Sequence, residues 1–82
     1  MNIKINEIES TVMRIIAETL DVDLSIITQD LSIGEIPEWN SIGNMSIIAS
    51  IEEQMQVEIP MEDLFELTSV SSIVDEIKRI TQ

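Results

Sequence analysis

The chain has 82 residues, enough for one small domain with a single core but little room for a deep catalytic pocket. It contains no cysteine, histidine or tyrosine, which excludes disulfides, thiolate nucleophiles, structural zinc and the usual general base near neutral pH. Sixteen acidic residues against four basic ones give a net charge of −12, so nucleic acids and anionic membranes would repel the protein and basic partners would attract it.

The remaining composition favours a folded protein of the cytoplasm. With 44% hydrophobic residues, the chain has more apolar surface to bury than an acidic disordered segment. Its first ten residues, MNIKINEIES, hold no apolar run long enough for a signal peptide or a membrane span. No repeat or linker divides residues 1–82, so we expect a single domain.

The first predicted helix runs from about Asn6 to Thr19, with Asn6 suited to the N-cap position. Its apolar residues recur every three or four positions, as on one helix face: Ile8, Val12, Ile15, Ile16 and Leu20. The connection that follows, from Asp21 to Asn40, is long for a compact domain. Because it is rich in Leu, Ile and Val, we expect it to pack across the core, with one helical turn near Ser25 to Thr28.

The second predicted helix begins at Ser41, behind Asn40 as its N-cap, and ends near Gln54 to Gln56. At roughly 100° per residue, its apolar side chains form two strips. The first strip, of Ile47, Ile48, Ile51 and Met55, spans about 100° and suffices for a core face. The second strip, beside Ser41, is Ile42, Met45 and Ala49. Either neighbouring segments cover the second strip, or it stays exposed as a docking surface.

Two shorter segments complete the predicted fold. After Pro60, the stretch MEDLFEL suits a helical turn that carries Met61, Leu64 and Phe65 inward. The last helix follows Thr68 as N-cap, and its apolar stripe consists of Val70, Ile73, Val74 and Ile77. No run alternates with a period of two over enough residues to predict a strand. We therefore predict an all-α four-helix bundle: three main helices, a short third helix, and a long loop between helices 1 and 2.

Ser41 stands out because Asn40 can already cap the second helix and leave the serine hydroxyl free. The N–H groups and the positive dipole end of a helix start suit an attached phosphate. With no histidine in the chain, Ser41 lacks the base that would make it a nucleophile. Because no base is available, Ser41 is better suited to being modified than to reacting. The ordinary alternative for such a serine is a first-turn or capping role.

The layout resembles the acyl carrier protein family over nearly the whole chain. The resemblance rests on three stretches: Asn40-Ser41-Ile42, where that family usually reads Asp-Ser-Leu; IEEQMQVEIP at the end of the second helix; and MEDLFELTSVSSIVDEI for the third and fourth helices. It implies that Ser41 carries 4′-phosphopantetheine, attached by a phosphopantetheinyl transferase that contacts Asn40. Acyl or aminoacyl groups would then travel as thioesters between biosynthetic enzymes, as in fatty-acid or polyketide synthesis.

The resemblance also implies where partners dock. Trp39 and the second strip, Ile42, Met45 and Ala49, would contact acyl-loading and acyl-transferring enzymes or shelter the acyl chain. Acidic side chains would meet basic patches on these enzymes: Glu52, Glu53, Glu58, Glu62, Asp63 and Glu66. We expect the protein itself to be a monomer that catalyses no reaction.

Three departures from the family pattern point to a stand-alone carrier of a dedicated pathway. Asn40 replaces an aspartate that helps the transferase and its magnesium, so the cap is kept and a charge is lost. Gly43 and Ser46 stand where fatty-acid carriers commonly have acidic residues. Trp39 is expected to form a large flat surface beside the prosthetic arm.

Three other functions compete with that of a carrier. The main alternative is an unmodified interaction module of the same fold, which Asn40 supports. A calcium site in DVDLSIITQDLS is disfavoured, because Ile26 and Ser32 stand where an EF-hand loop needs glycine and glutamate. An enzyme is least favoured, since adjacent Glu52 and Glu53 point in different directions on a helix and make a poor catalytic pair.

Overall fold

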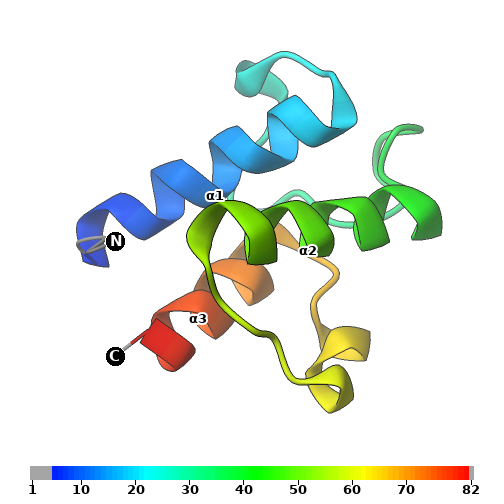
Figure 1. Cartoon of the computed structure of the whole chain (residues 1–82). Coiled ribbons are helices and arrows are strands. Elements are labelled where there is room, and N and C mark those ends of the chain that lie inside the picture. The colour runs from blue at the N-terminus through cyan, green and yellow to red at the C-terminus, as the bar shows by residue number, and fades with distance from the viewer. Residues whose placement is uncertain (1–4, 82) are drawn as a thin grey trace.

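The computed structural model describes residues 5–81, which form three α-helices and two short 3₁₀ helices (Figure 1). In chain order these are α1 (Ile5–Leu20), η1 (Leu24–Ile26), α2 (Ser41–Met55), η2 (Met61–Glu66) and α3 (Val70–Thr81). Residues 5–81 contain no strand, only an isolated bridge between Ser32 and Ser69, and no helix long and apolar enough to cross a membrane. The predicted all-α bundle is confirmed. The prediction that the first ten residues hold no signal peptide concerns a stretch of which residues 1–4 lie outside the described part.

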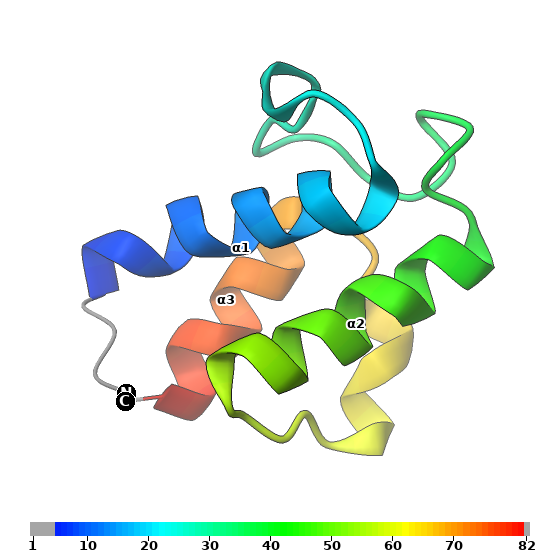
Figure 2. The same cartoon turned by 45° about the horizontal axis from the view of Figure 1, so that its top comes forward.

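Helix α1 packs against both α2 and α3 and forms the spine of the bundle (Figure 2). It begins at Ile5, so Asn6 lies inside the helix and the prediction that Asn6 caps it is wrong; the side chain of Asn6 lies outside the described part. The predicted apolar face of α1 is buried: Ile8, Val12, Ile15, Ile16 and Leu20. This face supplies one wall of the core.

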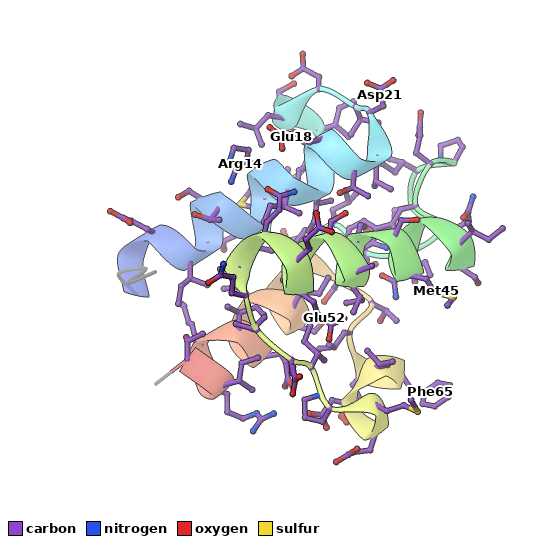
Figure 3. All side chains as sticks on the ribbon, viewed as in Figure 1. Arg14, Glu18, Asp21, Met45, Glu52 and Phe65 are labelled. Carbon is purple, nitrogen blue, oxygen red and sulfur yellow. The ribbon has the colours of Figure 1, made fainter. Side chains whose placement is uncertain are left out.

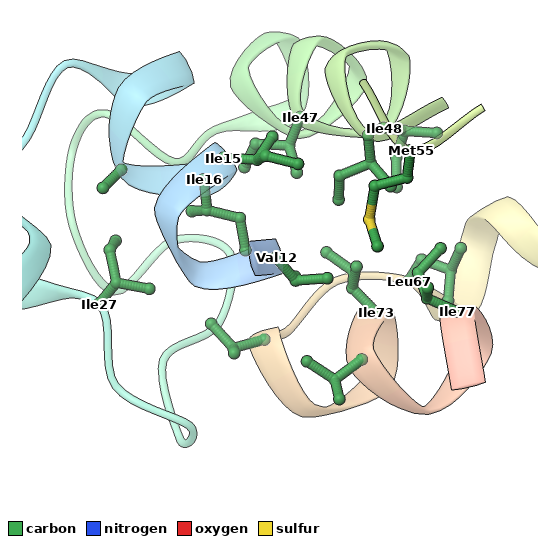
Figure 4. Close-up of a cluster of buried hydrophobic side chains, with 14 of the residues drawn as sticks. Val12, Ile15, Ile16, Ile27, Ile47, Ile48, Met55, Leu67, Ile73 and Ile77 are labelled. Atoms are coloured by element: carbon green, nitrogen blue, oxygen red, sulfur yellow. The ribbon is translucent and has the colours of Figure 1, made fainter. Parts of the chain in front are cut away.

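The core is rich in isoleucine side chains from all three α-helices (Figure 4). As predicted, α2 buries its first strip, Ile47, Ile48, Ile51 and Met55, and α3 buries Val70, Ile73, Val74 and Ile77. Each such side chain, fully buried, contributes about 1.5–3 kcal/mol relative to exposure. The second strip of α2 is thereby left outside the core.

The long connection packs across the core in part. Ile27, Leu31 and Trp39 are buried, whereas Leu24 and Ile26 are 53% and 43% exposed. The predicted helical turn exists as η1, which starts one residue and ends two residues earlier than expected. Asp23 caps η1, because its Oδ1 accepts a hydrogen bond of 2.9 Å from the backbone N–H of Ser25. This bond lowers the pKa of Asp23 below the ordinary value of 3.8.

The prediction that η2 carries Met61 and Phe65 inward is wrong, because their side chains are 78% and 91% exposed. Leu64 is only partly buried against the core. A 3₁₀ helix has about three residues per turn, so Phe65 is rotated by about 120° from the partly buried Leu64. The same period places Met61 in line with Leu64, so it does not explain why Met61 is exposed. An ion pair links α3 to η2, with Nη2 of Arg79 lying 3.0 Å from Oδ2 of Asp63.

Helix α3 is capped by Ser69, so the prediction of Thr68 as its N-cap is also wrong. The Ser69 hydroxyl accepts from the N–H of Ser72, and the N–H of Ser69 donates to the Ser72 hydroxyl, both at 3.1 Å. This reciprocal pair is a capping box with serine in the place of the usual glutamate. Thr68 instead pairs with the long connection, because its carbonyl accepts a hydrogen bond of 2.8 Å from the N–H of Ile33.

Candidate functional site

The start of α2 is fixed by its N-cap residue. Asn40 has an extended backbone, and its Oδ1 accepts a hydrogen bond of 2.9 Å from the N–H of Gly43, which confirms the predicted cap. Its Nδ2 also donates to the carbonyl of Pro37 at 3.4 Å. Both ends of the Asn40 amide are therefore engaged in holding the turn that precedes the helix.

Ser41 is the first residue of α2, and its side chain is exposed. Among the hydrogen bonds of residues 5–81, none involves its hydroxyl, because Asn40 provides the cap. The first backbone bond of the helix runs from the N–H of Asn44 to the carbonyl of Asn40 at 2.8 Å. The N–H groups of Ser41 and Ile42 precede that bond and point out of the helix end. The site thus offers one free hydroxyl beside two free amide donors.

Gly43, one of the two positions where fatty-acid carriers commonly have an acidic residue, has a structural reason to be glycine. A Cβ at this position would lie 2.5 Å from the backbone oxygen of Glu38 and 3.1 Å from Cδ2 of Leu20. The first distance is too short for any side chain, and a backbone atom cannot swing away. Gly43 is therefore required by the close approach of the connection and the end of α1 to α2.

The expectation that Trp39 offers a flat surface beside Ser41 is wrong, because its side chain is 0% exposed. The indole Nε1–H donates to Oδ1 of Asn44 at 2.8 Å, and Nδ2 of Asn44 donates to the carbonyl of Leu67 at 3.1 Å. The carbonyl of Trp39 accepts from the N–H of Gly34 at 2.8 Å. Trp39 is thus a core residue where the connection, α2 and the end of η2 meet.

The second strip of α2 is exposed, with Ile42 at 78% and Met45 at 74%, and Ala49 is also accessible. Met61 and Phe65 of η2 extend this apolar surface, and Met45 and Phe65 project on the same side of the molecule (Figure 3). We call these five residues the docking strip. Sequence reasoning missed Met61 and Phe65 because an apolar residue in a short helix is expected to point inward. The three-residue period of η2 was an available signal for Phe65 but not for Met61, which lies three residues before Leu64.

The predicted acidic contacts divide into free and engaged side chains. Glu53, Glu58, Glu62 and Glu66 are exposed. In contrast, Oε2 of Glu52 accepts a bond of 2.9 Å from the N–H of Ile59, and Asp63 pairs with Arg79. An open depression of about 600 Å³ lies between η2 and α3, lined by acidic side chains and Arg79. The structure therefore brings acidic charge to η2, whereas the front of α2, residues 41–46, carries no charge.

Comparisons with known proteins agree with this arrangement. The profile of the family described as "Phosphopantetheine attachment site" matches residues 10–77. Acyl carrier proteins of Rickettsia canadensis (strain McKiel) and Rickettsia rickettsii (strain Iowa) are each 30% identical over 73 residues, covering 89% of this chain and 85% of theirs. The fold and site define a small helical carrier domain. The chain belongs to the acyl carrier protein family, whose prosthetic group is 4′-phosphopantetheine.

Proposed function

We propose that Ser41 carries 4′-phosphopantetheine and that the protein passes acyl or aminoacyl groups, held as thioesters, between enzymes of a dedicated biosynthetic pathway. The observation that carries the proposal is the exposed Ser41 hydroxyl, free of hydrogen bonds within residues 5–81, at a helix start that Asn40 already caps. The thiol of the arm supplies the nucleophile that this cysteine-free chain lacks. The protein acts as a cytoplasmic, monomeric carrier and not as a catalyst.

The residues at the start of α2 fit a phosphodiester. Asn40 uses its side chain on the N–H of Gly43, so the N–H groups of Ser41 and Ile42 are free for phosphate oxygens. The positive end of the helix dipole favours the same charge. Asn40 keeps the cap of the usual aspartate without its charge, so we propose slower modification by a broad-specificity transferase than by the cognate one.

The docking strip indicates what kind of enzyme surface would bind this protein. Its side chains give α2 and η2 an exposed apolar surface that begins at Ile42, next to Ser41, and Glu53, Glu62 and Glu66 are exposed acidic residues of the same two helices. We propose that partner enzymes offer an apolar socket for Met45 and Phe65, with a basic rim for the carboxylates. Because Gly43 and Ser46 leave the front of α2 uncharged, enzymes that recognise charge there bind poorly, and this favours a dedicated pathway.

The test is intact-protein mass spectrometry after incubation with coenzyme A, magnesium and a phosphopantetheinyl transferase. We expect a phosphopantetheine mass gain in the parent protein and none in Ser41→Ala. The variant Asn40→Asp, which retains the cap, should be modified faster by a broad-specificity transferase. A parent protein that gains no mass, even with the cognate transferase, would instead identify an unmodified interaction module of the same fold.

A further inference from the structure

The inner side of α2 next to Ser41 is closed by a chain of contacts. At roughly 100° per residue, Asn44 lies about 60° from Ser41 toward the core. Its amide joins the buried indole of Trp39 to the carbonyl of Leu67, through bonds of 2.8 and 3.1 Å. Asn44 therefore bridges α2 to the end of η2 one turn below Ser41. We call Trp39, Asn44 and Leu67 the latch.

The opposite side of the helix start is closed as well. There Gly43 lies so near the Glu38 carbonyl and Leu20 that even a methyl group would not fit. Almost in line with Ser41, two turns along α2, Ile48 is only 7% exposed and belongs to the core. Both ways inward from the serine are therefore filled by packed side chains or by backbone.

We infer that the latch keeps the acyl cargo out of the helical core, so that it travels on the surface. This inference rests on the proposed attachment at Ser41. A chain that entered the core beside Ser41 would have to displace the indole of Trp39 and break both bonds of Asn44. Each of these groups is buried or half-buried, so the two displaced donors and two displaced acceptors would lose partners without gaining any from an alkyl chain.

A position outside the core restricts which acyl groups the protein can carry. A long alkyl chain held outside the core would at best lie along the docking strip, with its outer side in contact with water, which is unfavourable in proportion to the exposed apolar area. The depression between η2 and α3 is no substitute, because its lining includes Glu62, Asp63, Glu66, Asp75 and Glu76. The cargo is therefore a short or polar acyl group, such as a hydroxyacyl or aminoacyl unit. A partner enzyme reaches it without first extracting it from the carrier.

The experiment attaches an alkyl chain without any transferase. Since the chain has no cysteine, Ser41→Cys introduces one thiol, which methyl or decyl methanethiosulfonate converts to a mixed disulfide. The only tryptophan is Trp39, so its indole N–H gives one proton resonance. We expect the decyl and methyl adducts to share the same indole shift, the same protection from exchange with deuterium, and melting temperatures within about a degree. A shifted or newly protected indole in the decyl adduct alone, or a melting temperature raised by several degrees, would overturn the inference.

Opening the latch tests its role directly. In the Ser41→Cys background, Asn44→Ala removes both bonds of the latch, and Trp39→Leu removes the indole while keeping an apolar side chain. In whichever variant folds, the decyl adduct should melt several degrees higher than the methyl adduct, because the chain can now enter the core. If the folded variants ignore the decyl chain, the latch is not what excludes it and the inference fails. Neither readout depends on phosphopantetheine, so absence of transferase modification would count against the proposed function alone.

Discussion

The indole Nε1–H of Trp39 donates to Oδ1 of Asn44 at 2.8 Å, which ties the residue two before Ser41 to the residue three after it. The Asn44 amide continues to the Leu67 carbonyl, so one side chain satisfies groups from two other segments. The helix start and the η2–α3 junction are thereby held together beneath the proposed attachment point.

Replacing Asn44 by alanine should destabilise the protein by about 2 kcal/mol, because a buried donor left without a partner costs roughly 1–3 kcal/mol. Urea unfolding, followed by the emission of Trp39, measures the loss. The control is Gln54→Ala, an exposed position on the same helix, which should change stability by less than about 0.5 kcal/mol. Equal stability of the two variants would show that the Asn44 bonds contribute nothing net.

Replacing Gly43 by alanine should also destabilise, although alanine is the better helix former. The gain in helix propensity is about 1 kcal/mol, while forcing a methyl group to 2.5 Å from the Glu38 oxygen costs roughly 1–3 kcal/mol or more. We expect a net loss of about 1 kcal/mol or more, seen as a lower melting temperature. The exposed change Ser46→Ala, three residues on, should leave that temperature unchanged or raise it slightly. A more stable Gly43→Ala protein would contradict the close approach.

Truncation of the docking strip should separate function from stability. Met45→Ala and Phe65→Ala remove side chains that are 74% and 91% exposed, so stability should change by less than about 0.5 kcal/mol. With a cognate acyl-transferring enzyme, kcat/KM should fall about tenfold in each variant if the strip fills a socket. Leu24→Ala, an equally apolar change on η1, should leave kcat/KM unaltered. If all three variants behave alike, the strip is not the contact surface.

The cap of η1 should titrate at low pH. The bond from the Ser25 N–H favours ionised Asp23 and lowers its pKa in the folded state below 3.8. A lowered folded pKa means that the cap contributes its full stability above the unfolded pKa and loses it as pH falls through the lowered value. The Ser25 amide resonance should therefore shift with a midpoint below 3.8. That step should vanish in Asp23→Asn, and a midpoint at or above the ordinary value would show that the bond does not favour the carboxylate.

Local sequence patterns determined the secondary structure and much of the core. The spacing of Ile47, Ile48, Ile51 and Met55 predicted the buried face of α2, and the same period grouped Ile42, Met45 and Ala49 in a second strip without deciding whether that strip is covered or exposed. Asn40 was predicted correctly as a cap because capping depends on neighbours within three residues. The family resemblance also rested on local stretches, and the comparisons confirm it.

Only the tertiary structure decided which of the predicted site residues are buried, which are engaged in hydrogen bonds or ion pairs, and which are exposed. The buried Trp39 donates to Asn44, which in turn donates to the carbonyl of the distant Leu67. Gly43 is required because Glu38 and Leu20 approach it. Glu52 and Asp63, predicted as partner contacts, are engaged by Ile59 and Arg79, while Met61 and Phe65 face outward. These outcomes depend on contacts between segments far apart in the chain. Periodicity shows which face of a helix is apolar, but not which neighbour covers that face or satisfies a polar group beside it.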